Sequence, residues 1–278
     1  MSDANGTPAA QPHGQQVQPH GQQVQLQTDL DLRTLAEGFY LQALDQLSTS
    51  ALDEPSPLPG WTRKHVAIHM INNAEGLMRL LEWARTGQEN PMYPSREARD
   101  QDIEDGVAQT PAGDVRSISH EVAQELAEAL AGLAPEAWDA QVTGGQGQPI
   151  GASAIPWMRA REALLHSLDL GIGMTGLDFP AAAVDRLLDD VPATWAARGE
   201  DAHFLLRLAD RPEDPERLIA TGDAQAFAAQ PVEVVGEAAE VASYLAGRGW
   251  PRSAQDDTAK GGQGSATPQD LPAPPRWL

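Results

Sequence analysis

The sequence predicts a mainly α-helical protein, a four-helix bundle followed by a small α+β domain. Two observations predict this fold class. Apolar residues recur with a helical period from about residue 29 to 172, and short segments typical of strands follow Gly176. A chain of 278 residues is also long enough to bury a sizeable core in one large or two ordinary domains. We therefore expect the bundle over residues 28–175 and the α+β domain over residues 176–278.

Residues 1–27 precede this pattern and are predicted to form a disordered, low-complexity tail. The heptapeptide QPHGQQV occurs twice in succession, from residue 11 to residue 24. A tract of Gln, Pro and Gly cannot bury enough apolar surface to offset the entropy lost on ordering. Its histidines, His13 and His20, are therefore interpreted as tail residues rather than as metal ligands.

Helical spacing divides the first domain into four long helices and a short one. Thr62 has the side chain of an N-cap, and Gly87 and Pro91 break the pattern that follows it. Four long helices favour a bundle, whose core is a usual place for metal sites on facing helices. The long helices are predicted before the Pro-rich turn at residues 54–60 and over residues 62–85, 111–132 and 152–172, and the short one over residues 95–104.

The second domain has a mixed pattern. An amphipathic helix is predicted over residues 181–197, and a last helix over residues 238–246 ends at Gly247. Between them, short strands are predicted at residues 203–208, 217–221 and 232–235. The apolar C-terminal residues 271–278 are expected to pack on the body of the protein.

Composition excludes several classes of partner. The net charge of −21 argues against nucleic acid, because a phosphate-binding surface needs clustered Lys and Arg. The same charge disfavours docking on anionic lipid. No apolar stretch approaches the ~20 residues of a membrane span, and no signal peptide is recognised, so we expect a cytoplasmic protein. Cysteine is absent, so any thiol chemistry must come from a small molecule.

The spacing of Glu162 and His166 is the most informative local pattern. Residues four apart lie one above the other on a helix, so a carboxylate and an imidazole would project side by side, as two ligands of one divalent metal require. Neighbouring leucines place the pair near an apolar surface, where an unpaired carboxylate would be costly. One alternative stays open, in which a buried histidine is hydrogen-bonded to Glu162 without any metal.

A second predicted helix carries His65 and His69, also four apart, and either could reach across the bundle. His69 lies deeper in the helix among apolar residues and is the better third ligand. Two histidines and one glutamate would leave zinc with an open catalytic position. Asp169, three residues after His166, is either a hydrogen-bond partner of that histidine or an exposed charge.

Four separated segments carry a resemblance to a known family. They are LPGWTRKHVAIHMINNAEGL at residues 58–77, MYPSREARDQDIE at 92–104, WMRAREALLHSLDL at 157–170, and VGEAAEVASYLAGRG at 235–249 followed by LPAPPRW at 271–277. These segments resemble the mycothiol-dependent maleylpyruvate isomerases, members of the DinB-like bundle superfamily. The resemblance covers nearly everything from about residue 29 to 278 and leaves out the repetitive tail.

The resemblance implies a zinc ion held by His69, Glu162 and His166, with mycothiol, a low-molecular-weight thiol, as the cofactor. The implied reaction is the cis-to-trans isomerisation of maleylpyruvate to fumarylpyruvate in gentisate breakdown. Rotation about a carbon–carbon double bond requires that the bond first become single, and the addition of a thiolate achieves this. Coordination to zinc would deprotonate the thiol, whose free pKa is near ~8.5.

The implied substrate is a dicarboxylate, so its pocket needs cations despite the acidic surface. Arginine suits this role because its planar fork binds a carboxylate bidentately. Arg96, Arg99 and Arg248 lie in the matching segments and are the predicted catalytic arginines. For each of them, a surface salt bridge is the alternative role.

Two other functions stay open. The first is a zinc-dependent S-transferase of the same superfamily, which would conjugate a low-molecular-weight thiol to an electrophile. The second is a non-enzymatic bundle that binds a ligand or a partner protein, with the histidines only packed in its core.

Overall fold

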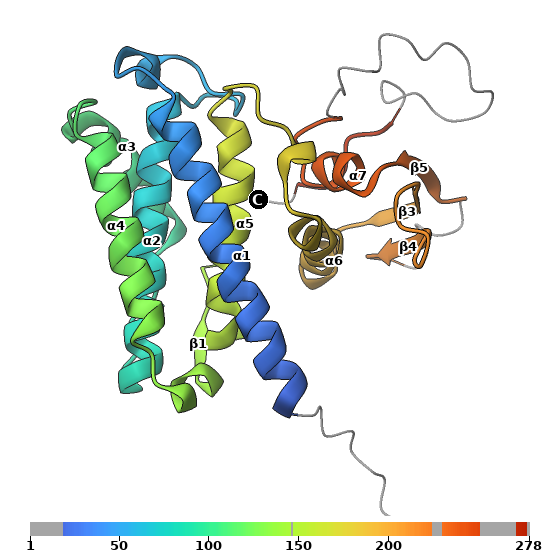
Figure 1. Ribbon diagram of the computed structural model, residues 1–278, viewed down its shortest axis with the longest axis horizontal. Helices are drawn as coiled ribbons and strands as arrows, with labels where there is room; N and C mark the ends of the chain where they lie inside the picture. Colours follow the sequence, from blue (N-terminus) through green and yellow to red (C-terminus); the bar gives the residue numbers. More distant parts are fainter. Residues whose placement is uncertain (1–18, 146, 224–229, 251–270, 277–278) are drawn as a thin grey trace, which may run out of the picture.

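The computed structural model describes residues 19–145, 147–223, 230–250 and 271–276. Four long helices stand side by side as a bundle, and a second unit of helices and strands lies beside them (Figure 1). The fold class that the sequence predicts is therefore confirmed. The long helices are α1 (Pro19–Asp45), α2 (Arg63–Thr86), α4 (Val115–Ala131) and α5 (Ile155–Asp169).

Helix α1 begins upstream of its predicted start. Residues 19–27, expected to belong to a disordered tail, form its first turns, so this part of the prediction is wrong. A helix that has started gains one hydrogen bond for each residue added, and the side chain of Gln25 also donates to Asp29 one turn later, at 2.8 Å. Residues 1–18 of the predicted tail lie outside the described residues.

The packing of the bundle brings α2 and α5 together. Helix α1 packs most extensively on α5 and α2 on α4, while α2 and α5 also contact each other. Helix α2 begins after Thr62, as predicted, and ends at Gly87, whose φ of 72° is the left-handed conformation that glycine adopts readily. A shorter helix, α3 (Arg96–Gln109), packs on α2 and begins after Ser95, whose hydroxyl accepts the backbone N–H of Ala98.

A small hairpin lies between α4 and α5. Strand β1 (Gln141–Thr143) pairs antiparallel with β2 (Pro149–Gly151) around the predicted Gly-rich loop. These strands were not predicted, because three residues are too few to show an alternating pattern. The described connections of the bundle also contain three short 3-10 helices: η1 (Ser50–Asp53), η2 (Pro135–Asp139) and η3 (Ala152–Ala154).

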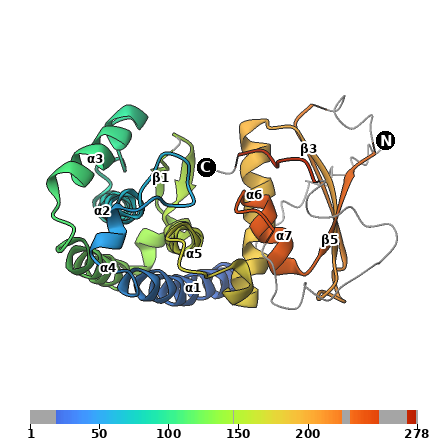
Figure 2. The same cartoon turned by 90° about the horizontal axis from the view of Figure 1, so that it is seen from above.

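The second unit is a three-stranded sheet with two helices on one face. Its elements are η4 (Gly176–Asp178), α6 (Ala181–Arg198), β3 (Ala202–Leu208), β4 (Glu216–Thr221), β5 (Val232–Gly236) and α7 (Ala238–Leu245). The strand order is β4-β3-β5, with β3 antiparallel to β4 and parallel to β5. Alternate residues of β3 are buried, and α6 and α7 lie between the sheet and the bundle (Figure 2).

One continuous hydrophobic cluster joins the bundle to the second unit. Polar contacts add to it: Arg161 of α5 pairs with Asp190 of α6 at 2.9 Å. The guanidinium of Arg186, also on α6, lies 5.2 Å from the ring centroid of Trp157 on α5. The second unit is thereby held against α5. The division between residues 175 and 176 stays a prediction.

None of the described helices combines the length and the apolar character that a membrane span needs.

Candidate metal centre

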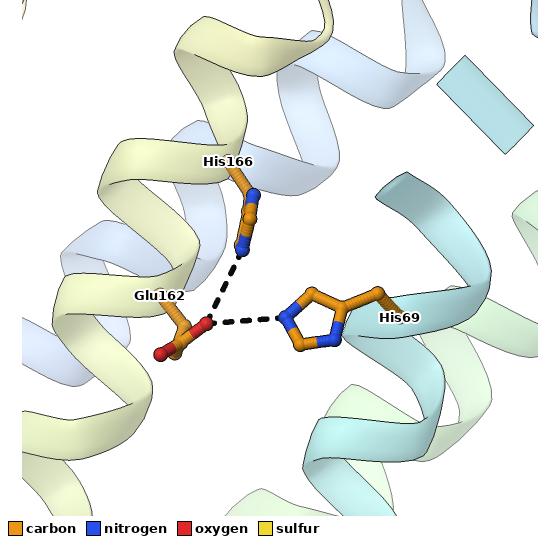
Figure 3. A group of neighbouring side chains, drawn as sticks. All are labelled: His69, Glu162 and His166. Atoms are coloured by element: carbon orange, nitrogen blue, oxygen red, sulfur yellow. Dashed lines mark hydrogen bonds and ion pairs between the residues drawn. The ribbon is translucent and has the colours of Figure 1, made fainter. Parts of the chain in front are cut away.

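Three predicted side chains converge inside the bundle (Figure 3). Oε2 of Glu162 on α5 lies 3.2 Å from Nε2 of His69 on α2 and 3.2 Å from Nε2 of His166, one turn further along α5. One candidate ligand atom from each residue lies within 4.8 Å of the other two. All three side chains are buried. The structure therefore groups two imidazoles and one carboxylate as a divalent metal requires.

Arg159 of α5 connects three helices beside this cluster through a buried ion pair to α1 and a hydrogen bond to α2. Arg159, three residues before Glu162 on α5, donates two hydrogen bonds to the carboxylate of Glu37 on α1, at 2.7 and 2.8 Å. Its remaining terminal nitrogen donates to the backbone oxygen of Met70 on α2, at 2.8 Å. Because Met70 follows His69 in the chain, this contact helps to fix the position of the third imidazole.

One nitrogen of His166 makes no hydrogen bond with any described residue. Nδ1 of His166 donates to Oδ2 of Asp169 at 2.8 Å, which places a ring proton on Nδ1 and leaves Nε2 facing Glu162. That Nε2 is buried and forms no hydrogen bond with any described residue, although Glu162 is near. A buried polar atom without a partner costs free energy. A cation bound between the three side chains would satisfy it, so these residues fit a metal.

Burial and contacts among the side chains of the cluster set their pKa values. Burial lowers the pKa of His69 to about 4. Burial alone would raise the pKa of Glu162, but hydrogen bonds and charge from His166 and His69 outweigh it and hold that pKa well below its usual range. Near neutral pH, Glu162 is therefore a carboxylate and His69 a neutral imidazole, the forms that bind metal. Burial alone would lower the pKa of His166, but contacts with Asp169 and Glu162 outweigh it and raise that pKa.

His65, the other histidine considered as a ligand, has a different role. Its Nδ1 accepts the backbone N–H of Thr62 at 3.1 Å, while the hydroxyl of Thr62 accepts the backbone N–H of His65 at 3.3 Å. These reciprocal bonds form a capping box at the start of α2. The ring also stacks on Trp61, at 6.1 Å between ring centroids. His65 is thus occupied by the helix cap, and His69 is the α2 histidine in the cluster.

Asp169 is a buried partner of His166 rather than an exposed charge. Its side chain is 2% exposed. Besides His166, it binds Arg248 from the end of the second unit, with Nη2 of the arginine 2.7 Å from Oδ2 and Nε 3.2 Å from Oδ1. Burial alone would raise the pKa of Asp169, but the contacts with His166 and Arg248 outweigh it and hold that pKa below its usual value.

The other two predicted arginines lie on α3. Nη2 of Arg99 donates toward Nδ1 of His69 at 3.4 Å, and Nη1 donates to Asp100 at 2.8 Å. Arg96 is exposed in the first turn of the same helix. Arg99 therefore contacts a residue of the cluster directly, whereas Arg248 reaches it through Asp169.

The structure adds a residue that was not predicted from the sequence. The hydroxyl of Tyr93, just before α3, is buried and has no hydrogen-bond partner among the described residues. Burial raises the pKa of Tyr93 to about 12, and Arg99 and Glu162 are among the charged groups that act on its phenol. The phenol thus lies on the α3 side of the cluster. Tyr93 is a single aromatic residue without a regular spacing to the other candidate residues, so the sequence alone does not identify it.

Comparisons with known proteins agree with this geometry. Residues 34–171 match the family model described as the mycothiol maleylpyruvate isomerase N-terminal domain. The crystal structure of a mycothiol-dependent maleylpyruvate isomerase is 31% identical to this chain, with a TM-score of 0.76, over 91% of this chain and 97% of that one. The structure of a histidine-to-alanine mutant of the same enzyme gives the same values. None of the curated proteins matches the chain.

Proposed function

The chain belongs to the mycothiol-dependent maleylpyruvate isomerase family, and we propose that it converts maleylpyruvate to fumarylpyruvate with the help of zinc and a low-molecular-weight thiol. The proposal is supported by 31% identity over 91% of the chain. The observation that carries it is the buried His69, Glu162 and His166 cluster, in which Nε2 of His166 makes no hydrogen bond with a described residue.

We propose that His69, Glu162 and His166 hold the zinc ion. Three protein ligands leave one position for a further ligand, the arrangement of catalytic rather than structural zinc sites. When bound there, zinc would supply a positive charge that lowers the pKa of a coordinated thiol and keeps its sulfur nucleophilic. Other residues of the protein orient these ligands. Asp169 accepts the Nδ1 proton of His166 in a hydrogen bond. Arg159 donates to the backbone oxygen of Met70, the residue after His69, and so holds α2 in place.

A thiol nucleophile has to come from outside the chain, because the sequence contains no cysteine. The chemistry that mycothiol would supply is addition of its thiolate to the double bond, with the π electrons moving toward the carbonyl oxygen, followed by rotation and by elimination that returns the thiolate and the trans isomer. Because the thiolate is regenerated and the product is an isomer of the substrate, this reaction needs no oxidant or reductant.

The substrate's negative charges need cationic partners, for which the sequence offers Arg96, Arg99 and Arg248 as candidates. Arg99 is the best placed of the three to bind a carboxylate, because its guanidinium lies at the cluster, 3.4 Å from His69. There it would also stabilise negative charge that builds up on a carbonyl oxygen during the addition.

The direct test uses the full-length protein loaded with zinc, together with mycothiol and maleylpyruvate. We expect catalytic loss of the cis-enol absorbance and formation of the trans isomer. Metal analysis should find about one zinc per chain, and much less in Glu162→Gln. A folded, zinc-loaded protein without isomerase activity would contradict the proposal.

The same experiment separates the two alternatives. A thiol conjugate formed in stoichiometric yield, without isomerisation, would support the S-transferase. A native protein that is stable without metal and does not take it up would support a non-enzymatic bundle, with His69 simply hydrogen-bonded to Glu162.

A further inference from the structure

We propose that Arg248 is a positioning residue: by binding Asp169 it fixes His166 for metal binding, so the metal centre of the bundle is completed from the second unit. The inference rests on the proposed metal site but not on the proposed substrate. It assigns Arg248 a role that differs from direct contact with a carboxylate of the substrate.

The three side chains form a continuous chain of contacts. One oxygen of Asp169, Oδ2, lies 2.8 Å from Nδ1 of His166 and 2.7 Å from Nη2 of Arg248, and its other oxygen lies 3.2 Å from Nε of the same arginine. The arginine therefore holds the carboxylate by both oxygens, which fixes the plane of the carboxylate as well as its position. A fixed carboxylate in turn fixes the ring of His166, and with it the direction in which Nε2 points.

The backbone around Arg248 is built to aim its side chain. The residue lies between Gly247 and Gly249, with φ angles of 74° and 75°. Residues other than glycine rarely adopt this left-handed backbone conformation, so the turn after α7 depends on glycine at both positions. The backbone N–H of Arg248 also donates to the oxygen of Ser243 at 2.9 Å, which anchors the turn to the helix.

The contacts of the guanidinium favour positioning over substrate binding. Nε and Nη2 are engaged by Asp169, and Nη1 donates to the backbone oxygen of Ala246 at 2.9 Å. The side chain is only 13% exposed. A substrate carboxylate would have to displace Asp169 and leave that buried carboxylate bound to His166 alone, which is unfavourable.

The end of α5 that carries Asp169 is held from the bundle side too. The hydroxyl of Ser56 donates to the backbone oxygen of Asp169 at 2.7 Å, and Nε of Arg63 donates to the backbone oxygen of Leu170 at 2.7 Å. The backbone of Asp169 is thus fixed independently of Arg248. Replacing Arg248 should therefore change the side-chain orientation of Asp169 and His166 rather than unfold the end of the helix.

The experiment measures metal binding, not turnover. Zinc affinity is determined by competition with a chromophoric chelator, and the visible spectrum of the cobalt(II) form reports ligand geometry. We expect Arg248→Met to bind zinc roughly 10- to 100-fold more weakly, the usual effect of losing a partner of a metal-bound histidine, and to change the cobalt spectrum. Arg248→Lys keeps the charge but not the planar fork, so its affinity should be intermediate.

The matched control is Arg211→Met. Arg211 is another arginine of the second unit that binds two carboxylates, those of Asp185 and Asp210, so its loss tests for a general effect of removing such a pair. This variant should bind zinc like the wild type. If Arg248→Met does not fold, the same measurements on Arg248→Lys decide the question.

Wild-type zinc affinity and a wild-type cobalt spectrum in a folded Arg248 variant would overturn the inference. The outcome is separate from that of the proposed function. Zinc binding that depends on Arg248 in a protein without isomerase activity would remove only the proposed reaction, whereas isomerase activity with unchanged metal binding in Arg248→Met would remove only the positioning role.

Discussion

The guanidinium of Arg99 lies 3.4 Å from Nδ1 of His69, the ring nitrogen opposite the one that faces Glu162. In this arrangement Nδ1 accepts from Arg99 and Nε2 donates to Glu162. A metal bound at Nε2 would require the ring proton on Nδ1, where it would face another donor. Metal binding and the Arg99 contact therefore compete, and occupation of the site would release the guanidinium toward an anionic substrate.

The first prediction concerns Arg99→Gln. We expect KM for maleylpyruvate to rise about 10- to 100-fold, because a hydrogen bond to a charged group is lost. Zinc affinity should not fall, since the variant removes a positive charge from beside His69 and shortens the side chain that carries the competing donor. Steady-state kinetics and chelator competition measure the two effects. A variant that binds zinc much more weakly than the wild type would argue against this competition.

The second prediction is that His166→Ala abolishes turnover while the protein still folds. The variant removes a proposed zinc ligand, but Asp169 keeps its contact with Arg248, so no buried charge is left alone. Turnover and far-UV circular dichroism provide the measurements. The control is His120→Ala, because His120 is half exposed and pairs with Asp45 on the outside of the bundle. Normal turnover in His166→Ala would refute the proposed site.

The third prediction concerns the buried pair of Arg159 and Glu37, whose side chains are 1% and 6% exposed. Arg159→Met alone leaves Glu37 buried and unpaired, which typically destabilises a protein by about 3–5 kcal/mol. The double variant with Glu37→Leu should recover much of this loss, because no buried charge remains. Urea unfolding of both variants measures the difference. Equal stability of the single and double variants would contradict this explanation.

The fourth prediction concerns alkaline pH and the three tyrosines of the chain. Burial raises the pKa of Tyr93 to about 12 and that of Tyr244 to about 12, and it raises the pKa of Tyr40 as well. In the folded protein, tyrosinate absorbance should therefore stay low between about pH 10 and 11, whereas the urea-unfolded chain should titrate near its usual value of ~10.

The sign of the effect on stability follows from these shifts. Above about pH 10 the unfolded chain loses phenolic protons that the folded protein keeps, so the free energy of unfolding should fall as the pH rises from about 10 toward 12. Thermal unfolding across this range tests the direction. A folded protein in which one tyrosine titrates near pH 10 would show that its ring is not buried as described.

Much of the candidate site could be predicted because its signals are local. The four-residue spacing of Glu162 and His166 places both side chains on one face of a helix before any packing is known. The choice of His69 over His65 also followed from helix position. The structure supplies the physical reason, since His65 lies three residues after Thr62 and completes a capping box with it.

The remaining parts depend on contacts between distant positions. The partner of Asp169 could not be identified from its neighbours, because Arg248 lies 79 positions further along the chain. The start of α1 was missed for a different reason. Composition suggested a disordered tail, whereas extension of an existing helix carries residues 19–27 into regular structure.

The shared hydrophobic cluster has a consequence for how the protein unfolds. Because buried residues of α5, such as Trp157, belong to the same cluster as Trp195 of α6, neither unit can lose its structure without exposing apolar surface of the other. We therefore expect a single cooperative melting transition for the intact chain. A fragment that ends near residue 175 should be less stable and prone to aggregate, so truncation is a poor way to isolate the metal-binding part.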